Sequence, residues 1–207
     1  KNPYSDWLNN QKIALKDLNS EGDSKGFYPD SLVNRLKAFG YSTETLQFML
    51  LPFVSELRDP VGSMGNDSAL ACLSDHSRII YDYFKQLFAQ VTNPAIDSIR
   101  EEVVMSLSCS IGPEGNLLSN KEANAHRLVV DHPILTNEEM TSLHQCNHRG
   151  WTSKTIDITY ETDSNHNLSD MLDSICEQST QAIEDGHSLV VLSDRNIDSK
   201  RNAVSSL

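Results

Sequence analysis

The clearest potential metal ligands in this chain are the imidazole and thiol groups of His144, Cys146 and His148. If this segment were helical, His144 and His148 would share one face and Cys146 would lie on another side. A zinc site requires three or four convergent ligands, and the sequence offers no evident fourth. We therefore expect surface histidines near a helix end and predict no metal site.

Hydrolytic chemistry would require a nucleophile and a base brought together by the fold. The adjacent pairs Asp75-His76 and Asp131-His132 do not meet this requirement, because neighbouring side chains usually point apart. The charged run from Asp97 to Glu102 is typical of helix capping and an exposed face. We predict no catalytic residue in this chain.

Two short polar segments remain as candidates. Gly62-Ser-Met-Gly65 fits neither GxGxxG nor GxxxxGK[ST], so we interpret it as a structural or channel loop rather than a phosphate site. Thr92-Asn93-Pro94 ends a predicted helix, and proline leaves the last helical carbonyls without partners. Thr92 and Asn93 would either cap those carbonyls or line a polar passage, and the two roles are compatible.

Composition limits the class of protein. The 207 residues carry a formal net charge of −12, with 38% hydrophobic and 22% charged residues, which is typical of a soluble globular domain. Such an acidic surface disfavours nucleic acid, and the longest apolar run is too short for a membrane span. We expect an intracellular protein, and the four scattered cysteines to be reduced thiols.

The first half of the chain is predicted to be mostly helical. Helical patterns run from residue 7 to 18, from 32 to 39 up to Gly40, and from 42 to 57 with a break or kink at Pro52. The strongest pattern is an apolar stripe over 78–91, which predicts a buried amphipathic helix. A loop is predicted between residues 59 and 67, since two glycines and a proline oppose regular structure.

The second half is predicted to contain strands. Ser98 and Glu101 form a capping-box pattern, a strand is expected over 103–110, and a further strand over 127–130. Thr136 and Glu139 form a second capping box before a helix to about His144.

Apolar and polar residues alternate over 155–161, which predicts a strand. An apolar helix face runs over 168–183, and Gly186 ends that helix. The continuous apolar run over 188–192 is typical of a strand buried on both faces. This strand–helix–strand order predicts parallel strands. The fold class is therefore α/β, a partial or degenerate (β/α)-barrel-like domain with a helical N-terminal portion. Because the chain begins with Lys1, we expect a fragment or a processed product. Residues 203–207 carry no stop signal, so we also expect truncation at the C-terminus.

Several segments resemble, in order, the central domain of glutamate synthases. The closest are Tyr81-Asp-Tyr-Phe-Lys-Gln-Leu-Phe-Ala-Gln-Val-Thr-Asn-Pro94 and Gly62-Ser-Met-Gly-Asn-Asp67. Others are Arg100-Glu-Glu-x-Val-Met-Ser-Leu107, Gly112-Pro-Glu-Gly-Asn-Leu-Leu118, Pro133-Ile-Leu-Thr136 and Leu192-Ser-Asp-Arg195. The resemblance covers about residues 27–207, and Asn2-Pro-Tyr-x-x-Trp-Leu8 resembles the segment leading out of the amidotransferase domain.

The resemblance implies a division into residues 1–26, a linker from the preceding amidotransferase domain, and residues 27–207, the central domain. It implies a non-catalytic role between the amidotransferase and FMN-binding synthase domains of one polypeptide. FMN and an iron–sulfur cluster would lie in the parent enzyme and not in this fragment, and the compartment would be cytoplasm or plastid stroma. Ammonia in transit would pass residues at the tunnel entrance, for which we predict Ser63, Met64, Asn66, Thr92 and Asn93.

Neutral ammonia must cross shielded from water, which calls for sparse hydrogen-bonding groups and tight walls rather than strong charges. Met64 would serve as an adaptable plug. The alternative is a self-contained (β/α) ligand-binding module or enzyme, which a bound flavin, nucleotide or metal would favour.

Overall fold

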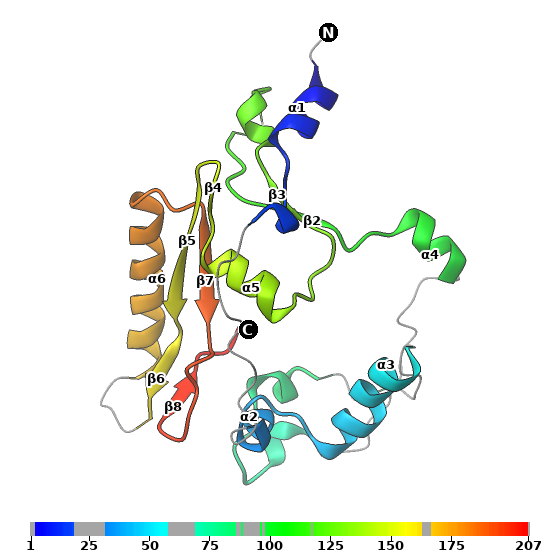
Figure 1. Ribbon diagram of the computed structural model, residues 1–207. Helices are drawn as coiled ribbons and strands as arrows, with labels where there is room; N and C mark the ends of the chain where they lie inside the picture. The colour runs from blue at the N-terminus through cyan, green and yellow to red at the C-terminus, as the bar shows by residue number, and fades with distance from the viewer. Residues whose placement is uncertain are drawn as a thin grey trace. The chain divides into compact units, whose positions relative to one another are not determined.

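The computed structural model describes residues 3–18, 32–57, 69–85, 88, 96, 98–116, 118–162 and 167–206. The chain divides into two compact units, each described here by itself. Unit 1 comprises Lys1–Gly26 and Glu102–Val204, and unit 2 comprises Phe27–Glu101 and Ser205–Leu207. Figure 1 shows the elements of both units.

Unit 1 contains all the strands of the described chain, in three small sheets. In the first, β1 (Ile13–Ala14) pairs in parallel with β3 (Leu128–Val130), which pairs antiparallel with β2 (Cys109–Ile111). The second has the order β4-β5-β7, from β4 (Asn147–His148), β5 (Trp151–Asp157) and β7 (Leu189–Ser193). The third pairs β6 (Thr159–Glu161) with β8 (Arg201–Ala203). These mixed sheets make an α/β unit, and a closed barrel is not formed by the described residues.

The predicted strand–helix–strand unit is confirmed. Strands β5 and β7 are parallel, and α6 (Leu168–Glu184) connects them and lies along the sheet in Figure 1. The Asn167 side-chain oxygen caps α6 by accepting a hydrogen bond from the backbone amide of Asp170. In return, the Asp170 carboxylate accepts one from the backbone amide of Asn167. Gly186, with φ +87°, adopts the left-handed backbone that follows the end of the helix.

The prediction that the strand over 188–192 is buried on both faces is wrong. Leu192 is 53% exposed. Strand β7 lies at the edge of its sheet, beside β5. Helix α6 therefore has only these two parallel strands to cover. Leu172 and Ile183 of α6 also remain exposed, because the apolar stripe of this helix is wider than the sheet.

A second predicted helix, α5 (Asn137–His144), is also confirmed with its capping box. The Thr136 hydroxyl accepts a hydrogen bond from the Glu139 amide, and the Glu139 carboxylate accepts one from the Thr136 amide. Both hydrogen bonds favour the charged carboxylate and lower the pKa of Glu139. On α5, Leu143 belongs to the main core cluster, together with Ile13, Leu18, Leu128, Cys146 and Trp151.

The N-terminal part of unit 1 differs from the prediction of one helix over 7–18. Helix α1 spans Tyr4–Gln11 and is followed by β1 and the 3₁₀ helix η1 (Leu15–Asp17). The interruption places Ile13 beside β3, where its side chain is only 1% exposed. Burial of this residue in the sheet outweighs the weak helical preference of the segment.

The remaining elements of unit 1 are short. Helix α4 (Ser98–Val104) begins in unit 2 and ends in unit 1, and the 3₁₀ helix η6 spans Glu122–Ala125. A strand was predicted over 103–110, but β2 begins only at Cys109 because α4 continues to Val104. The strand predicted over 127–130 is confirmed as β3.

Unit 2 is built from helical segments alone among the residues described. These are α2 (Leu32–Ala38), the π-helix η3 (Thr45–Leu50), α3 (Leu51–Glu56) and the 3₁₀ helices η4 (Ala71–Leu73) and η5 (Ile80–Tyr83). Gly40 follows α2 with φ +75°, as the predicted stop requires. The helix is not broken at Pro52. The backbone stays helical at Leu50 and Leu51, where the π-helix η3 passes into α3 just before the proline, which has no amide hydrogen to donate.

The buried amphipathic helix predicted over 78–91 is wrong for the part of this segment that the structure describes. Only η5, with four residues, is helical there. Its apolar stripe is not covered, since Phe84 is 74% exposed and Phe88 is 67% exposed. A helix of this kind depends on burial of its apolar face, and without that burial aromatic residues favour it little.

Among the described residues, none of the helices combines the length and the apolar character needed to cross a lipid bilayer.

Candidate functional site

The five residues predicted to line a tunnel lie outside the described residues. They are Ser63, Met64, Asn66, Thr92 and Asn93. Their placement therefore stays a prediction. Among the described residues, a cluster of hydrogen-bonded polar side chains lies in unit 1, where β5 and β7 finish.

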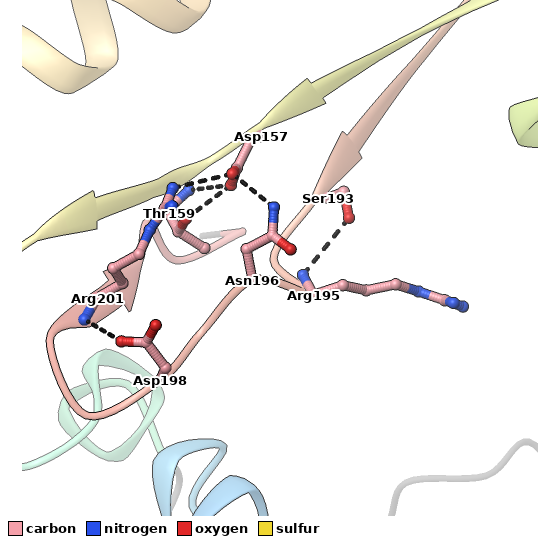
Figure 2. Close-up of polar contacts among 7 residues, drawn as sticks. All are labelled: Asp157, Thr159, Ser193, Arg195, Asn196, Asp198 and Arg201. Atoms are coloured by element: carbon pink, nitrogen blue, oxygen red, sulfur yellow. Dashed lines mark hydrogen bonds and ion pairs between the residues drawn. The ribbon is translucent and has the colours of Figure 1, made fainter. Parts of the chain in front are cut away.

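The centre of this polar cluster is Asp157, the last residue of β5 (Figure 2). Its Oδ1 atom accepts hydrogen bonds from the Thr159 amide at 2.9 Å and the Thr159 hydroxyl at 2.7 Å. Its Oδ2 atom accepts from the Asn196 amide group at 2.7 Å and from the Arg201 guanidinium at 2.9 Å. One carboxylate thus joins the end of β5, the start of β6, the loop after β7 and the start of β8. We call these four residues the Asp157 clamp.

The loop between β7 and β8 is ordered by a second carboxylate. The Asp198 Oδ1 atom accepts hydrogen bonds from the backbone amides of Lys200 at 2.7 Å and Arg201 at 2.9 Å. A backbone bond from the Asp198 amide to the Arg201 carbonyl closes the same turn. Asp198 thereby fixes the position from which Arg201 reaches Asp157.

The clamp is suited to holding the fold and poorly suited to proton transfer. Burial alone would raise the pKa of Asp157, but hydrogen bonds from Asn196 and Thr159 and the positive charge of Arg201 together lower it. A carboxylate has about four acceptor positions, and four donors contact this one. Asp157 therefore has little capacity left to accept a proton or a ligand.

Arg195 is an exposed cation of this region. Figure 2 shows its guanidinium pointing away from the Asp157 clamp, while its backbone amide donates to the Ser193 hydroxyl. Burial, and secondarily the charge of Arg195, lowers the pKa of His144. The His144 Nδ1 atom lies 2.7 Å from the Thr155 hydroxyl, so that α5 is joined to the middle of β5.

The three potential metal ligands of the sequence have separate structural roles. Cys146 is buried in the core with its sulfur 3.8 Å from the Trp151 carbonyl oxygen, and burial raises the pKa of its thiol. His144 contacts Thr155, and His148 belongs to β4. Among the described residues, no three His, Cys, Asp or Glu side chains converge on a point that would hold a metal ion.

A hollow of about 220 Å³ lies in unit 1, where the parallel strands β1 and β3 end. Its charged lining is mixed, with Lys12 and Lys16 beside Asp131, His132 and Glu139. The Glu139 carboxylate is engaged by the Thr136 amide, which leaves it less available to a ligand. The hollow has room for a small molecule, but its lining shows no specific arrangement of donors or acceptors.

In the segment Gly112-Pro-Glu-Gly-Asn-Leu-Leu118, the structure explains why the first residue is a glycine. Gly112 has φ +128°, and a Cβ atom there would overlap the Trp151 indole. The Arg127 guanidinium donates to the Gly112 carbonyl and forms an ion pair with Glu114 at 3.3 Å. Gly112 and Glu114 therefore hold the backbone of this segment against Trp151 and Arg127.

The sequence analysis missed the Asp157 clamp. Asp157 was visible as a carboxylate near the end of a predicted strand, and Asn196 and Arg201 follow the next parallel strand. Because parallel strands finish at the same edge of a sheet, their following residues could have been predicted to meet there. The predicted strand extended through this position to residue 161, and that concealed the break between β5 and β6.

The fold and the clamp together define a small α/β domain whose described polar groups stabilise its own architecture. A sequence model of the glutamate synthase central domain matches residues 34–207. The chain belongs to this family, the glutamate synthase central domain family.

Relatives are found in fungi, bacteria and plants. The chain is 44% identical over 173 residues to glutamate synthase [NADH] of Schizosaccharomyces pombe, covering 82% of this chain. It is 40% identical over 198 residues to the glutamate synthase [NADPH] large chain of Bacillus subtilis, covering 96% of this chain. It is 35% identical over 197 residues to the chloroplastic ferredoxin-dependent glutamate synthase of Spinacia oleracea, covering 94%. The chain spans only 8%, 13% and 12% of the length of these relatives, respectively.

Proposed function

We propose that this chain is the central part of a glutamate synthase polypeptide, where it joins the amidotransferase domain to the FMN-binding synthase domain and forms part of the ammonia tunnel between them. The observation that carries the proposal is the family match over residues 34–207, in relatives of which the chain is 13% or less. In this role the chain has no reaction of its own.

The surface of unit 2 supports a role inside a larger polypeptide. From Phe48 to Val54, along η3 and α3, every residue is apolar, and Phe48 is 69% exposed and Val54 77% exposed; Leu57, just after α3, is 88% exposed. A helix that is apolar all round is typically buried in the core of a larger protein. We infer that other domains of the parent cover this surface.

The tunnel role concerns the two segments predicted from the sequence. Hydroxyl and amide groups at Ser63, Asn66, Thr92 and Asn93 would guide neutral ammonia with weak hydrogen bonds, and Met64 would close the passage around it. A charged lining would instead trap ammonia as ammonium. Gly62–Asn66 and Thr92–Asn93 contain no charged residue, as such a passage requires, and Asp67 directly follows the first of these segments.

The proposal assigns flavin and cluster chemistry to the parent enzyme. Cys72, Cys109, Cys146 and Cys176 are free thiols far apart in the sequence, and iron–sulfur clusters require closely grouped cysteines. FMN and the cluster would therefore be held by residues outside this chain. The parallel β5 and β7 with α6 would be the remnant of a (β/α) barrel that binds no flavin.

The tunnel proposal is tested in the full-length parent enzyme with Thr92→Val and Asn93→Ala. If these residues line the passage, the variants lose ammonia, and glutamine hydrolysis exceeds the stoichiometric formation of glutamate. Thr180→Val is a matched control, since this exposed α6 hydroxyl only donates to the Cys176 carbonyl. Unchanged coupling in both tunnel variants, together with unchanged dependence of glutamine hydrolysis on 2-oxoglutarate, would contradict the proposal.

A further inference from the structure

The C-terminal end of α1 is held by side chains from other parts of unit 1. An α-helix leaves the carbonyls of its last turn without partners inside the helix. The Arg149 guanidinium donates to the Asn10 carbonyl at 2.8 Å and to the Lys12 carbonyl at 3.5 Å. The His126 Nδ1 atom lies 3.1 Å from the Gln11 carbonyl oxygen. Three successive carbonyls at this helix end are therefore engaged by two side chains that come much later in the sequence.

The same histidine also contacts the turn that carries Arg149. The His126 Nε2 atom lies 2.9 Å from the Arg149 carbonyl oxygen. Arg149 has φ +48°, a backbone conformation that arginine rarely adopts, and this turn joins β4 to β5. On another side, the Trp151 ring packs edge-on against His126, with ring centroids 6.0 Å apart. We call His126 and Arg149 together the α1 clasp.

The two partners of the His126 ring determine which form of the imidazole fits. Both are backbone carbonyl oxygens, which can only accept hydrogen bonds. A neutral imidazole has one N–H donor, so its other nitrogen would turn a lone pair toward the second oxygen. An imidazolium has two N–H donors and satisfies both oxygens. The carbonyl end of a helix also favours a positive charge.

The charges carried by the elements around His126 are of both signs. These elements are α1, η6, β3 and the β4–β5 hairpin, and their charged or titratable residues are Asp6, Lys12, Lys121, Glu122, Arg127, His148, Arg149, Lys154 and Asp157. The Glu122 carboxylate accepts a hydrogen bond from the Gln11 side chain at 2.9 Å, and Arg127 is paired with Glu114. Because both signs are represented, the two carbonyl contacts are the feature that favours the imidazolium.

We propose that the α1 clasp is a pH-sensitive attachment, in which His126 holds α1 as the imidazolium. When the pH rises, one ring nitrogen releases its proton to water, one carbonyl loses its donor and α1 is held less firmly. Imidazole groups change charge between about pH 5 and pH 8, so the attachment is firmer at the acidic end of this range. Arg149 stays charged throughout and supplies the part that does not depend on pH.

The clasp concerns unit 1 by itself and goes beyond the proposed function. Its consequence in the parent enzyme rests on the proposed function, because α1 would there lie in the connection from the amidotransferase domain. The clasp would then make the fastening of this connection to the central domain depend on pH.

Hydrogen–deuterium exchange over α1 in the full-length parent enzyme tests the proposal. Exchange rates are divided by the intrinsic rate at each pH to give the protection of residues 4–12. This protection should fall about fivefold from about pH 5 to about pH 8, which corresponds to one hydrogen bond of about 1 kcal/mol. His126→Asn keeps one N–H donor and lacks a second, so its protection should stay near the alkaline level at both pH values. Protection that does not change with pH in the original enzyme, or a pH dependence that survives in His126→Asn, would overturn the proposal.

Two further variants separate the histidine from its surroundings. Arg149→Asn keeps a residue that tolerates positive φ and keeps the carbonyl contacted by His126, but removes the guanidinium. It should lower the protection of α1 to a similar extent at both pH values and retain the fivefold change, and loss of that change would overturn the role of His126. His132→Gln, at an exposed histidine of the same unit, is the matched control and should behave like the original enzyme. The amides of α6 report that each variant is folded and should keep their protection within about twofold.

These outcomes are separable from failure of the proposed function. Exchange over α1 reports an attachment within unit 1, whereas the tunnel variants report the coupling of glutamine hydrolysis to glutamate formation. A pH-independent α1 with uncoupled tunnel variants would overturn this inference alone. A pH-dependent α1 that requires His126, with fully coupled tunnel variants, would overturn the tunnel alone.

Discussion

The two units of the molecule differ in how their apolar residues are used. All the buried hydrophobic residues of the described chain lie in unit 1, where Trp151, Ile13, Leu128 and Ile156 are the largest fully buried side chains. The described part of unit 2 also carries large apolar side chains, yet Phe48, Val54, Leu57, Leu73 and Phe84 are mostly exposed. Among the described residues, unit 1 therefore carries its own core, whereas the apolar side chains of unit 2 are left largely exposed; we infer that another part of the parent polypeptide covers them.

The largest expected effect is at the core of unit 1. Trp151→Ala removes a side chain that is 2% exposed and should lower the free energy of unfolding by about 3–5 kcal/mol. Phe84→Ala, at a unit 2 side chain that is 74% exposed, should change it by less than about 0.5 kcal/mol. Urea denaturation of the 207-residue chain measures both. Similar losses in the two variants would remove the contrast between the units.

A smaller effect is expected where the backbone approaches that core. Gly112→Ala introduces a Cβ that overlaps Trp151 and also strains a backbone with φ +128°, which should cost about 2–3 kcal/mol. Gly186→Ala is the matched control, because its φ is also positive at +87° but nothing lies within 4 Å of the added Cβ. It should cost only about 1 kcal/mol. Thermal unfolding measures both variants. If the two substitutions lower the stability equally, the close approach of Gly112 to Trp151 does not contribute to the stability of the chain.

The smallest effect is expected at the Asp157 clamp, and it depends on pH. The pKa of Asp157 is lower in the folded chain than in the unfolded chain, where it is about 3.9. The stability that Asp157 contributes is therefore fully present above about pH 3.9 and is lost as the pH falls through the folded-state pKa. Because its side chain is 36% exposed, solvent limits the contribution to about 1 kcal/mol. Asp157→Asn should therefore destabilise the chain at pH 6 and much less at pH 3.

Asp173→Asn, on the exposed surface of α6, is the control for the pH experiment and should leave stability unchanged at both values. If the difference in free energy of unfolding between Asp157→Asn and the original chain stays constant from pH 6 to pH 3, the carboxylate charge does not hold the clamp.

The strand–helix–strand unit could be predicted because several local signals agree. Alternation in β5, the apolar face of α6, the cap at Asn167 and the stop at Gly186 all favour the same structure. The hairpin between β4 and β5 was missed. Its turn places both Arg149 and Gly150 at positive φ, and arginine is an unusual residue for that conformation.

The helix predicted over 78–91 was wrong in its described part because periodicity does not reveal whether a partner exists. The spacing of Ile80, Tyr83 and Phe84 is the same whether the stripe is buried by this chain or by another part of a longer polypeptide. The Asp157 clamp was missed for a related reason, since Asn196 and Arg201, which donate two of its four hydrogen bonds, lie 39 and 44 positions from Asp157 in the sequence. The predicted tunnel residues stay a prediction.

The central claim is that unit 2 becomes stable only when the rest of the parent polypeptide covers it. Hydrogen–deuterium exchange measures this directly when the 207-residue chain and the full-length enzyme are compared over α3 in unit 2 and β5 in unit 1. The account predicts that β5 amides are protected in both proteins, whereas α3 amides are protected only in the full-length enzyme. Equal protection of α3 in the two proteins would contradict it.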